Sequence, residues 1–154
     1  MHQNSTDDLS SECGIDYRRL RDLLAAREWE EADEETADKM LAPIGKEGWW
    51  NVETEDIEKI PCTDLRTIDR LWVQYSNEHF GFSVQKQIWQ GVGGQPGMYD
   101  YYIYKKFYDK FYDIVGWQAV IDRASEYVFN LNAPRGHLPL VGVMLLGQFN
   151  KFIL

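Results

Sequence analysis

Apolar residues recur at steps of three and four positions along most of this chain, which is the spacing of one face of an α-helix. The pattern is clearest in residues 61–90. It predicts two helices there, joined by an aromatic turn, Phe80-Gly81-Phe82, whose glycine is free to adopt a backbone angle that presents both rings. The apolar positions of the two helices are Leu65, Ile68, Trp72 and Tyr75 in the first, and Val84, Ile88 and Trp89 in the second.

The same spacing predicts helices on both sides of this pair. One is capped by Asp16, a second covers residues 29–41, a short turn covers 55–60 and an aromatic helix covers 99–114. Thr63 or Asp64 is expected to cap the helix after Pro61, and Ser83 the one that follows. Residues 118–126 are expected to form a loop.

No stretch predicts a large sheet, so the expected fold class is all-α. We expect a single compact helical domain over residues 16–154. It follows a polar segment, residues 1–15, whose composition is typical of a disordered tail. The stretch after residue 139 is apolar. It is expected either to fold onto the core as a short helix or to remain an exposed apolar end that is prone to association.

Charge and composition narrow the classes of partner. The formal net charge of −9 argues against a nucleic-acid partner and against general attraction to anionic lipid, because both need a basic face. Six Trp, nine Tyr and seven Phe exceed ordinary usage; a core, a ligand pocket or a partner surface would each use them. The two cysteines, Cys13 and Cys62, lack metal-type spacing and predict free thiols in a reducing compartment. No apolar run is long enough to cross a membrane.

No catalytic group of residues stands out, so the chain is not expected to be an enzyme. The three histidines, His2, His79 and His137, lack carboxylate or thiolate partners at metal-binding spacing, and no metal site is predicted. Asp64 and Asp69 are five positions apart and do not share a helix face, which leaves a paired-carboxylate role unsupported.

Two sets of charged residues, a pair of arginines and a run of acids, are each compatible with two roles. Arg66 and Arg70 share a helix face, where they can pair with the acidic helix 29–41 or reach a carboxylate on a ligand. The acids of that helix are either a docking surface or an ordinary solvated face.

Several blocks of residues, in order, resemble one known family. They are P-C-x-D-L-R-T-I-D from Pro61, F-G-F-S-V-Q-K from Phe80, V-G-W from Val115 and A-P-x-G-H-L-P from Ala133. Together they resemble the "genomes uncoupled" tetrapyrrole-binding domain, a regulator of magnesium chelatase in oxygenic phototrophs. The resemblance extends from Tyr17 to Pro139.

This resemblance implies an all-helical fold shaped like a cupped hand. It implies noncovalent binding of protoporphyrin IX or Mg-protoporphyrin IX, regulation of magnesium chelatase through its large subunit, and no chemistry of its own. The location it implies is the cytoplasm of a cyanobacterium or the plastid stroma, and peripheral contact with a membrane stays open. A bilin- or haem-binding paralogue, and a helical interaction module without a ligand, remain alternatives.

Carried over residue by residue, the resemblance also implies a binding site. The palm of the hand and the later loop would contribute Val73, Phe80, Phe82, Val84, Ile88, Trp117, Phe129, Leu131 and Arg135. Arg66, Arg70, Arg135 and Lys86 are candidates for the cations that meet the ligand's carboxylates. The chain departs from the family pattern in residues 118–126, which are shorter and lack a second Trp.

Overall fold

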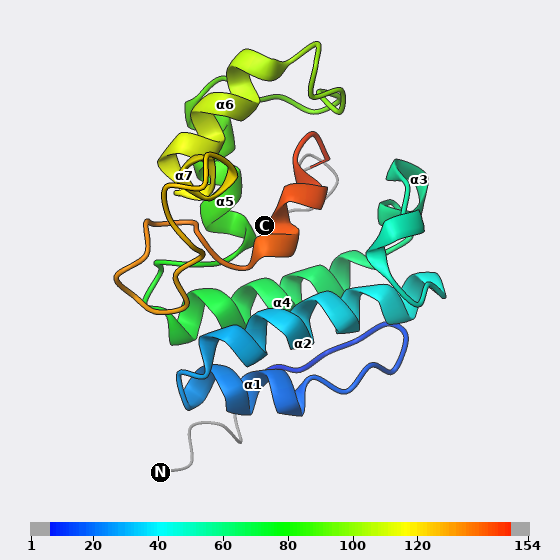
Figure 1. Ribbon diagram of the computed structural model, residues 1–154. Helices are drawn as coiled ribbons and strands as arrows, with labels where there is room; N and C mark the ends of the chain where they lie inside the picture. The colour runs from blue at the N-terminus through cyan, green and yellow to red at the C-terminus, as the bar shows by residue number, and fades with distance from the viewer. Residues whose placement is uncertain (1–6, 149–154) are drawn as a thin grey trace.

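The computed structural model describes residues 7–148 of the chain and contains helices but no strand within that range. Its base consists of α1 (Arg18–Ala25), α2 (Trp29–Leu41) and α4 (Cys62–Tyr75), which lie side by side (Figure 1). The base is followed by α5 (Phe82–Gly91), α6 (Lys105–Ile114) and α7 (Trp117–Ile121). The predicted all-α fold class and the single compact domain are confirmed.

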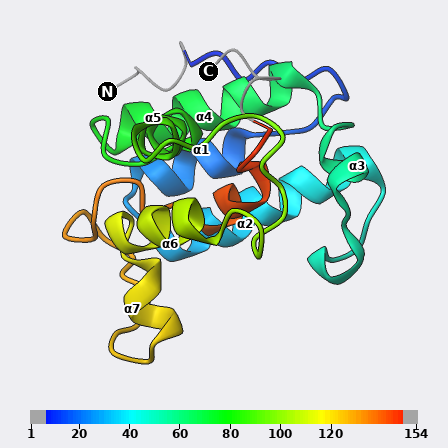
Figure 2. The ribbon, with the colours of Figure 1, turned by 90° about the horizontal axis from the view of Figure 1, so that it is seen from above.

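Short helical turns complete the fold. They are η2 (Ala42–Ile44), η3 (Trp49–Asn51), α3 (Thr54–Ile57) and η4 (Leu140–Leu145). Two views at right angles place η4 between α6 on one side and α3 on the other (Figures 1 and 2). The base therefore carries two raised sides with η4 between them.

The apolar face predicted for residues 62–75 forms the centre of the core. Leu65, Ile68 and Trp72 have no exposed surface, and the Trp72 indole donates a hydrogen bond to Thr36 Oγ1 at 2.9 Å. The rings of Trp29, Trp72 and Phe80 pack with centroids 5.6–6.1 Å apart. This aromatic cluster joins α2, α4 and the turn before α5.

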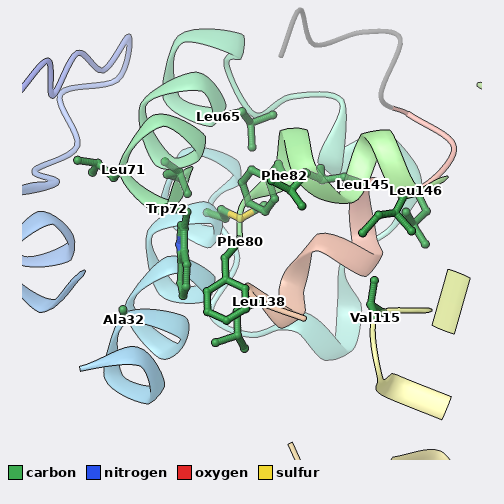
Figure 3. Packing of buried hydrophobic residues seen from close by; sticks show 14 of the residues in the cluster. Ala32, Leu65, Leu71, Trp72, Phe80, Phe82, Val115, Leu138, Leu145 and Leu146 are labelled. Atoms are coloured by element: carbon green, nitrogen blue, oxygen red, sulfur yellow. The ribbon is translucent and has the colours of Figure 1, made fainter. Parts of the chain in front are cut away.

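The aromatic turn, predicted to present its rings to a ligand, instead directs them into this core. Phe80 and Phe82 are both fully buried, and Phe80 lies between Trp72 and Leu138 (Figure 3). Because neither ring has exposed surface, neither can contact a ligand in this conformation. Gly81 has a φ of 125°, so the turn does use the freedom of a glycine, but to bury both rings.

Two predicted helix caps are wrong because the side chains have other partners. Asp64 accepts hydrogen bonds from Tyr17 Oη at 2.7 Å, from the Glu12 amide at 2.9 Å and from the Ser11 hydroxyl. The amide of Ser83 is capped from α4, by Asp69 Oδ1 at 2.7 Å, and α5 already begins at Phe82.

The contacts of Asp64 also decide the course of the residues before α1. Residues 7–15, assigned from composition to the tail, run along α4 (Figure 2). The Thr67 hydroxyl donates to the Ser10 carbonyl at 2.6 Å, and the Tyr75 hydroxyl donates to Asp7 at 2.5 Å. These residues are therefore part of the packed domain. Residues 1–6 lie outside the described range, as does the end of the apolar C-terminal stretch from residue 149.

Two element boundaries differ from the pattern of apolar residues. The aromatic helix begins at Lys105 rather than at residue 99, because Asp100 Oδ1 accepts the amides of Tyr102 and Ile103 and forms a separate turn. Residues 118–126, predicted as a loop, are helical as far as Ile121. Gly116, with a φ of 84°, separates this short helix from α6.

A carboxylate of α2 holds η4 onto the base. Asp33 Oδ1 accepts the Leu140 amide at 2.7 Å. Burial, more than the neighbouring Glu34 and Glu30, raises the pKa of Asp33 to about 6, while the hydrogen bond from Leu140 acts in the opposite direction. Folding therefore keeps a carboxylate in a position where its ionised form is unfavourable.

We predict that Phe82→Ala lowers the free energy of unfolding by about 3–5 kcal/mol, as expected for removal of a buried aromatic ring. Chemical denaturation measures this change. Phe107→Ala, at a half-buried position on α6, is the matched control and should cost less. Equal small losses for both variants would contradict the central position of Phe82.

We predict that Asp33→Asn raises the melting temperature at pH 7.5, since the amide keeps the acceptor for Leu140 without the buried charge. The folded pKa of Asp33 lies above the unfolded value of 3.8, so protonation favours the folded state as the pH falls through about 6. The advantage of the variant should therefore shrink between pH 7 and pH 4 in calorimetric scans. A difference that stays constant with pH would rule out this origin.

Candidate ligand-binding site

A hollow of about 410 Å³ lies between the end of α4, the first turns of α5 and the segment around Arg135. We call it the α4–α5 hollow. Its lining consists of Val73, Asn77, Glu78, Ser83, Val84, Gln87 and Arg135. Three residues that the sequence assigns to the ligand site, Val73, Val84 and Arg135, therefore meet here.

The elbow between α4 and α5 fixes the apolar wall of this hollow. A Cβ atom at Gly81 would lie 2.7 Å from Val73 Cγ2 and 3.0 Å from Asp69 Oδ1, so the backbone of the elbow rests directly on these two side chains. Asp69 holds the start of α5 through the Ser83 amide. Burial raises the pKa of Asp69, and the hydrogen bonds from Ser83 and Phe82 oppose that shift.

The opposite side of the hollow is formed by a segment that is distant in sequence. Gln85 Nε2, fully buried, donates to the carbonyls of Gly136 at 3.0 Å and Pro139 at 2.8 Å. The Gly136 amide donates to the His79 carbonyl at 2.9 Å, and the Gly81 amide to the Leu138 carbonyl at 3.1 Å. These bonds fix the backbone on both sides of Arg135.

The guanidinium group of Arg135 is held at the rim. Its Nη2 donates to Gln87 Oε1 at 2.6 Å, and the side chain is exposed. Gln87 thus directs a cation across the mouth of the α4–α5 hollow. Glu78, also exposed, gives the lining a negative charge contributed from the end of α4.

His137 stabilises the backbone behind the hollow and is not arranged as a metal ligand. Its Nε2 accepts the Val128 amide at 3.0 Å, which leaves Nδ1 to donate to the Val115 carbonyl at 2.7 Å. The Trp117 indole donates to the His137 carbonyl at 2.9 Å. Burial lowers the pKa of His137, consistent with a neutral ring whose two nitrogen atoms are both engaged.

The remaining residues of the expected site do not line this hollow. Phe80 and Phe82 lie in the core beneath it. Ile88 supports the Arg135 segment from below, since a Cβ atom at Gly136 would lie 2.6 Å from its Cδ1. Phe129 and Leu131 are half-buried and pack against the core on the segment that leads to Arg135.

Trp117 and the two arginines of α4 lie elsewhere. Trp117 lines a separate hollow of about 140 Å³, whose other lining residues are Tyr112, Ile121, Tyr127, Leu140 and Val143. Arg70 Nη2 lies 3.3 Å from Asp8 Oδ2, and both side chains are largely exposed. Arg66 is one turn before Arg70 on α4.

Sequence reasoning missed the polar part of the lining. Asn77 and Glu78 have positive φ values of 55° and 67°, which turn the chain out of α4 toward α5. The end of the helical pattern at Ser76-Asn77 signals that turn but does not show which side chains it directs into a hollow. The sequence predicts Ser83 only as a helix cap and assigns no role to Gln87.

Neither a metal site nor a membrane-spanning helix is present within residues 7–148. No group of three or more His, Cys, Asp or Glu side chains in that range could hold a metal ion. No helix there is long and apolar enough to cross a membrane. Cys13 and Cys62 are not joined to each other by a disulfide bond.

The fold defines an all-α single-domain protein, and comparison with known proteins assigns it to a family. Residues 10–154 match the family described as GUN4-like, and the chain belongs to this family. The Ycf53-like protein of Synechocystis sp. is 37% identical over 139 residues, which cover 86% of this chain and 54% of that relative. The chloroplastic tetrapyrrole-binding protein of Arabidopsis thaliana is 31% identical over 151 residues, which cover 88% of this chain and 52% of that relative.

Solved structures agree with this assignment. GUN4 from Chlamydomonas reinhardtii has a TM-score of 0.74 at 36% identity, with 92% of this chain and 91% of that chain covered. The ligand-free structure of Arabidopsis thaliana GUN4 has a TM-score of 0.67 at 29% identity, with 85% and 92% covered. The chain spans about half the length of the curated relatives it matches.

Proposed function

We propose that this protein binds a porphyrin noncovalently in the α4–α5 hollow, with protoporphyrin IX and Mg-protoporphyrin IX as ligands. The observation that supports this best is the meeting of two apolar side chains, Val73 and Val84, with an oriented guanidinium group, Arg135, at one hollow. The GUN4-like family and the relative named as a tetrapyrrole-binding protein support the same ligand class.

The chemistry of the lining fits a porphyrin that carries carboxylates. The macrocycle is flat and apolar and needs apolar contact on its faces, whereas its carboxylates need a cation at the edge. Val73 and Val84 meet the first need and Arg135 the second. Glu78 repels carboxylates from the α4 end of the mouth, so the ligand would enter with its carboxylates toward Arg135.

The hollow is large enough for part of a macrocycle. Its volume of about 410 Å³ lies in the usual range for ligand pockets, roughly 300–1,000 Å³. In our proposal the segment before Arg135 covers the second face of the ring, with Phe129 and Leu131 turned toward it. Phe80, Phe82 and Ile88 act beneath the site as its support, and Trp117 holds the same segment through His137.

Arg66 and Arg70 are candidates for a second cation. They precede Val73 by seven and three residues on α4, which places all three near one face of that helix. Release of Arg70 from Asp8 would free it for a second carboxylate of the ligand.

We further propose that the protein regulates magnesium chelatase, through its large subunit, rather than catalysing a reaction. Presentation of the substrate or removal of the product needs only a binding site, which is what the α4–α5 hollow offers. The exposed acids of α2, Glu30, Glu31 and Glu34, are the proposed docking face. Relatives in a cyanobacterium and in chloroplasts suggest the cyanobacterial cytoplasm or the plastid stroma as its location.

We predict that Arg135→Gln weakens binding of protoporphyrin IX about 10-fold, the effect of losing roughly 1.4 kcal/mol of charge-assisted hydrogen bonding. Quenching of tryptophan fluorescence measures the affinity. Arg135 is exposed, so the fold should be preserved. Lys110→Gln, an exposed cation on α6, is the matched control and should leave the affinity unchanged.

The dimethyl ester of protoporphyrin IX sharpens this test, because it lacks the carboxylates that Arg135 is proposed to meet. Its affinity should be the same for the wild-type chain and for Arg135→Gln. Equal weakening of acid and ester would contradict the assigned contact. Parallel titrations with Mg-protoporphyrin IX, haem and biliverdin distinguish the porphyrin proposal from a bilin- or haem-binding role. Saturation by none of them would indicate a module for protein contacts alone.

A further inference from the structure

The contact between Gln87 and Arg135 at the mouth of the α4–α5 hollow joins two side chains that are distant in sequence. Arg135 Nη2 donates a hydrogen bond to Gln87 Oε1 at 2.6 Å. Both side chains are exposed, and both belong to the lining of the hollow. The acceptor in this contact is a neutral amide, so the positive charge of the guanidinium group is not balanced by the group that holds it.

Other cations of the molecule are held by acids instead. Arg70, for example, lies 3.3 Å from Asp8, measured from Nη2 to Oδ2. Within residues 7–148, Arg135 forms no ion pair, and Glu78, the one acid in the lining of the hollow, is not paired with it. A carboxylate partner would offset the charge of the guanidinium group, whereas an amide fixes its direction and leaves the charge to a ligand.

The two backbone segments that carry this contact are tied together by buried hydrogen bonds. Gln87 lies on α5, two positions after Gln85. The side-chain amide of Gln85 donates to the carbonyls of Gly136 at 3.0 Å and Pro139 at 2.8 Å. Because α5 and the segment around Arg135 cannot separate without breaking these bonds, the fold keeps Gln87 within reach of the guanidinium group.

The held guanidinium group keeps enough donors for a ligand. A guanidinium group has five N–H donors in a planar fork, and the contact with Gln87 engages one nitrogen atom, Nη2. A carboxylate is bound best by two parallel N–H donors, which Arg135 can still supply. The side-chain amide of Gln87 has N–H donors of its own, which attract an anion, whereas a carboxylate in its place would repel one.

We propose that Gln87 is a positioning residue that gives the α4–α5 hollow its selectivity for ionised carboxylates. It directs the guanidinium group of Arg135 across the mouth without neutralising it. This role of Gln87 rests on the proposed function, because the ligand group that Arg135 meets is the carboxylate of a porphyrin. The neutrality of the Gln87 side chain, and not only its hydrogen bond, then determines the affinity for the acid form of the ligand.

Gln87→Glu tests the neutrality of the side chain. The variant keeps the acceptor oxygen for Arg135 but adds a carboxylate that balances the cation. Tryptophan quenching should show that protoporphyrin IX binds about 10-fold more weakly than to the wild-type chain, while the affinity for its dimethyl ester stays within about twofold. An equal loss for acid and ester would overturn the proposal, because the ester has no carboxylate for Arg135 to meet.

Gln90→Glu is the matched control for this variant. Gln90 is exposed on the same helix as Gln87 but lies outside the lining of the hollow. The control adds the same charge to the chain, and it should weaken protoporphyrin IX by less than about twofold, since a solvated charge away from the contact is screened. Equal weakening by Gln87→Glu and Gln90→Glu would overturn the proposal, because the effect would then come from net charge.

Gln87→Met tests whether Gln87 acts through Arg135, since Met is of similar length and lacks the amide. It should weaken protoporphyrin IX about threefold in the wild-type chain and cause no further loss in Arg135→Gln. An equal loss in both backgrounds would overturn the positioning role.

Arg135→Gln by itself separates this role from the porphyrin site. If it leaves the affinity for protoporphyrin IX unchanged, both proposals are overturned. If it weakens the acid while Gln87→Glu does not, only the role of Gln87 is overturned.

Discussion

The structure depends on one constraint, the fastening of the backbone of residues 133–139 to the α4–α5 elbow by buried hydrogen bonds. Gln85 alone satisfies two carbonyl groups of that segment, those of Gly136 and Pro139. A buried carbonyl without a partner is costly, so these bonds specify one position for a segment that has no regular structure of its own. That position closes the core over Phe80 and brings Arg135 to Gln87, its partner 48 residues earlier in the chain.

The same rule explains why buried polar groups stand behind the proposed porphyrin site. Asp69, Gln85 and His137 are buried, and their hydrogen bonds go chiefly to backbone groups of irregular segments. Each of these side chains holds an irregular connecting segment in one position. Few side chains on these segments are then available to a ligand. Their direction is set by the fixed backbone rather than by their own packing. This is the physical basis for assigning binding to Val73, Val84 and Arg135, and support to Phe80 and Phe82.

The net charge of the chain bears directly on the α4–α5 hollow. An arginine lies at the mouth of this hollow. In a chain of net charge −9, a single oriented guanidinium distinguishes one patch from a surface that otherwise repels anions. The overall charge thus makes the proposed binding of a carboxylate ligand depend strongly on Arg135.

The sequence by itself determined the all-α fold class and the core faces of α4 and α5. Helical periodicity reports which face of a segment is apolar, and the burial of Leu65, Ile68 and Trp72 follows from it. Only the tertiary structure decided what each face meets. It turned Phe80 and Phe82 into the core, with Phe80 packed beside Leu138, and it made Asp64 a hydrogen-bond acceptor for residues 11–17 rather than a helix cap. Spacing along a chain cannot encode such partners, because the packing of distant segments depends on three-dimensional fit and on where buried polar groups find hydrogen bonds.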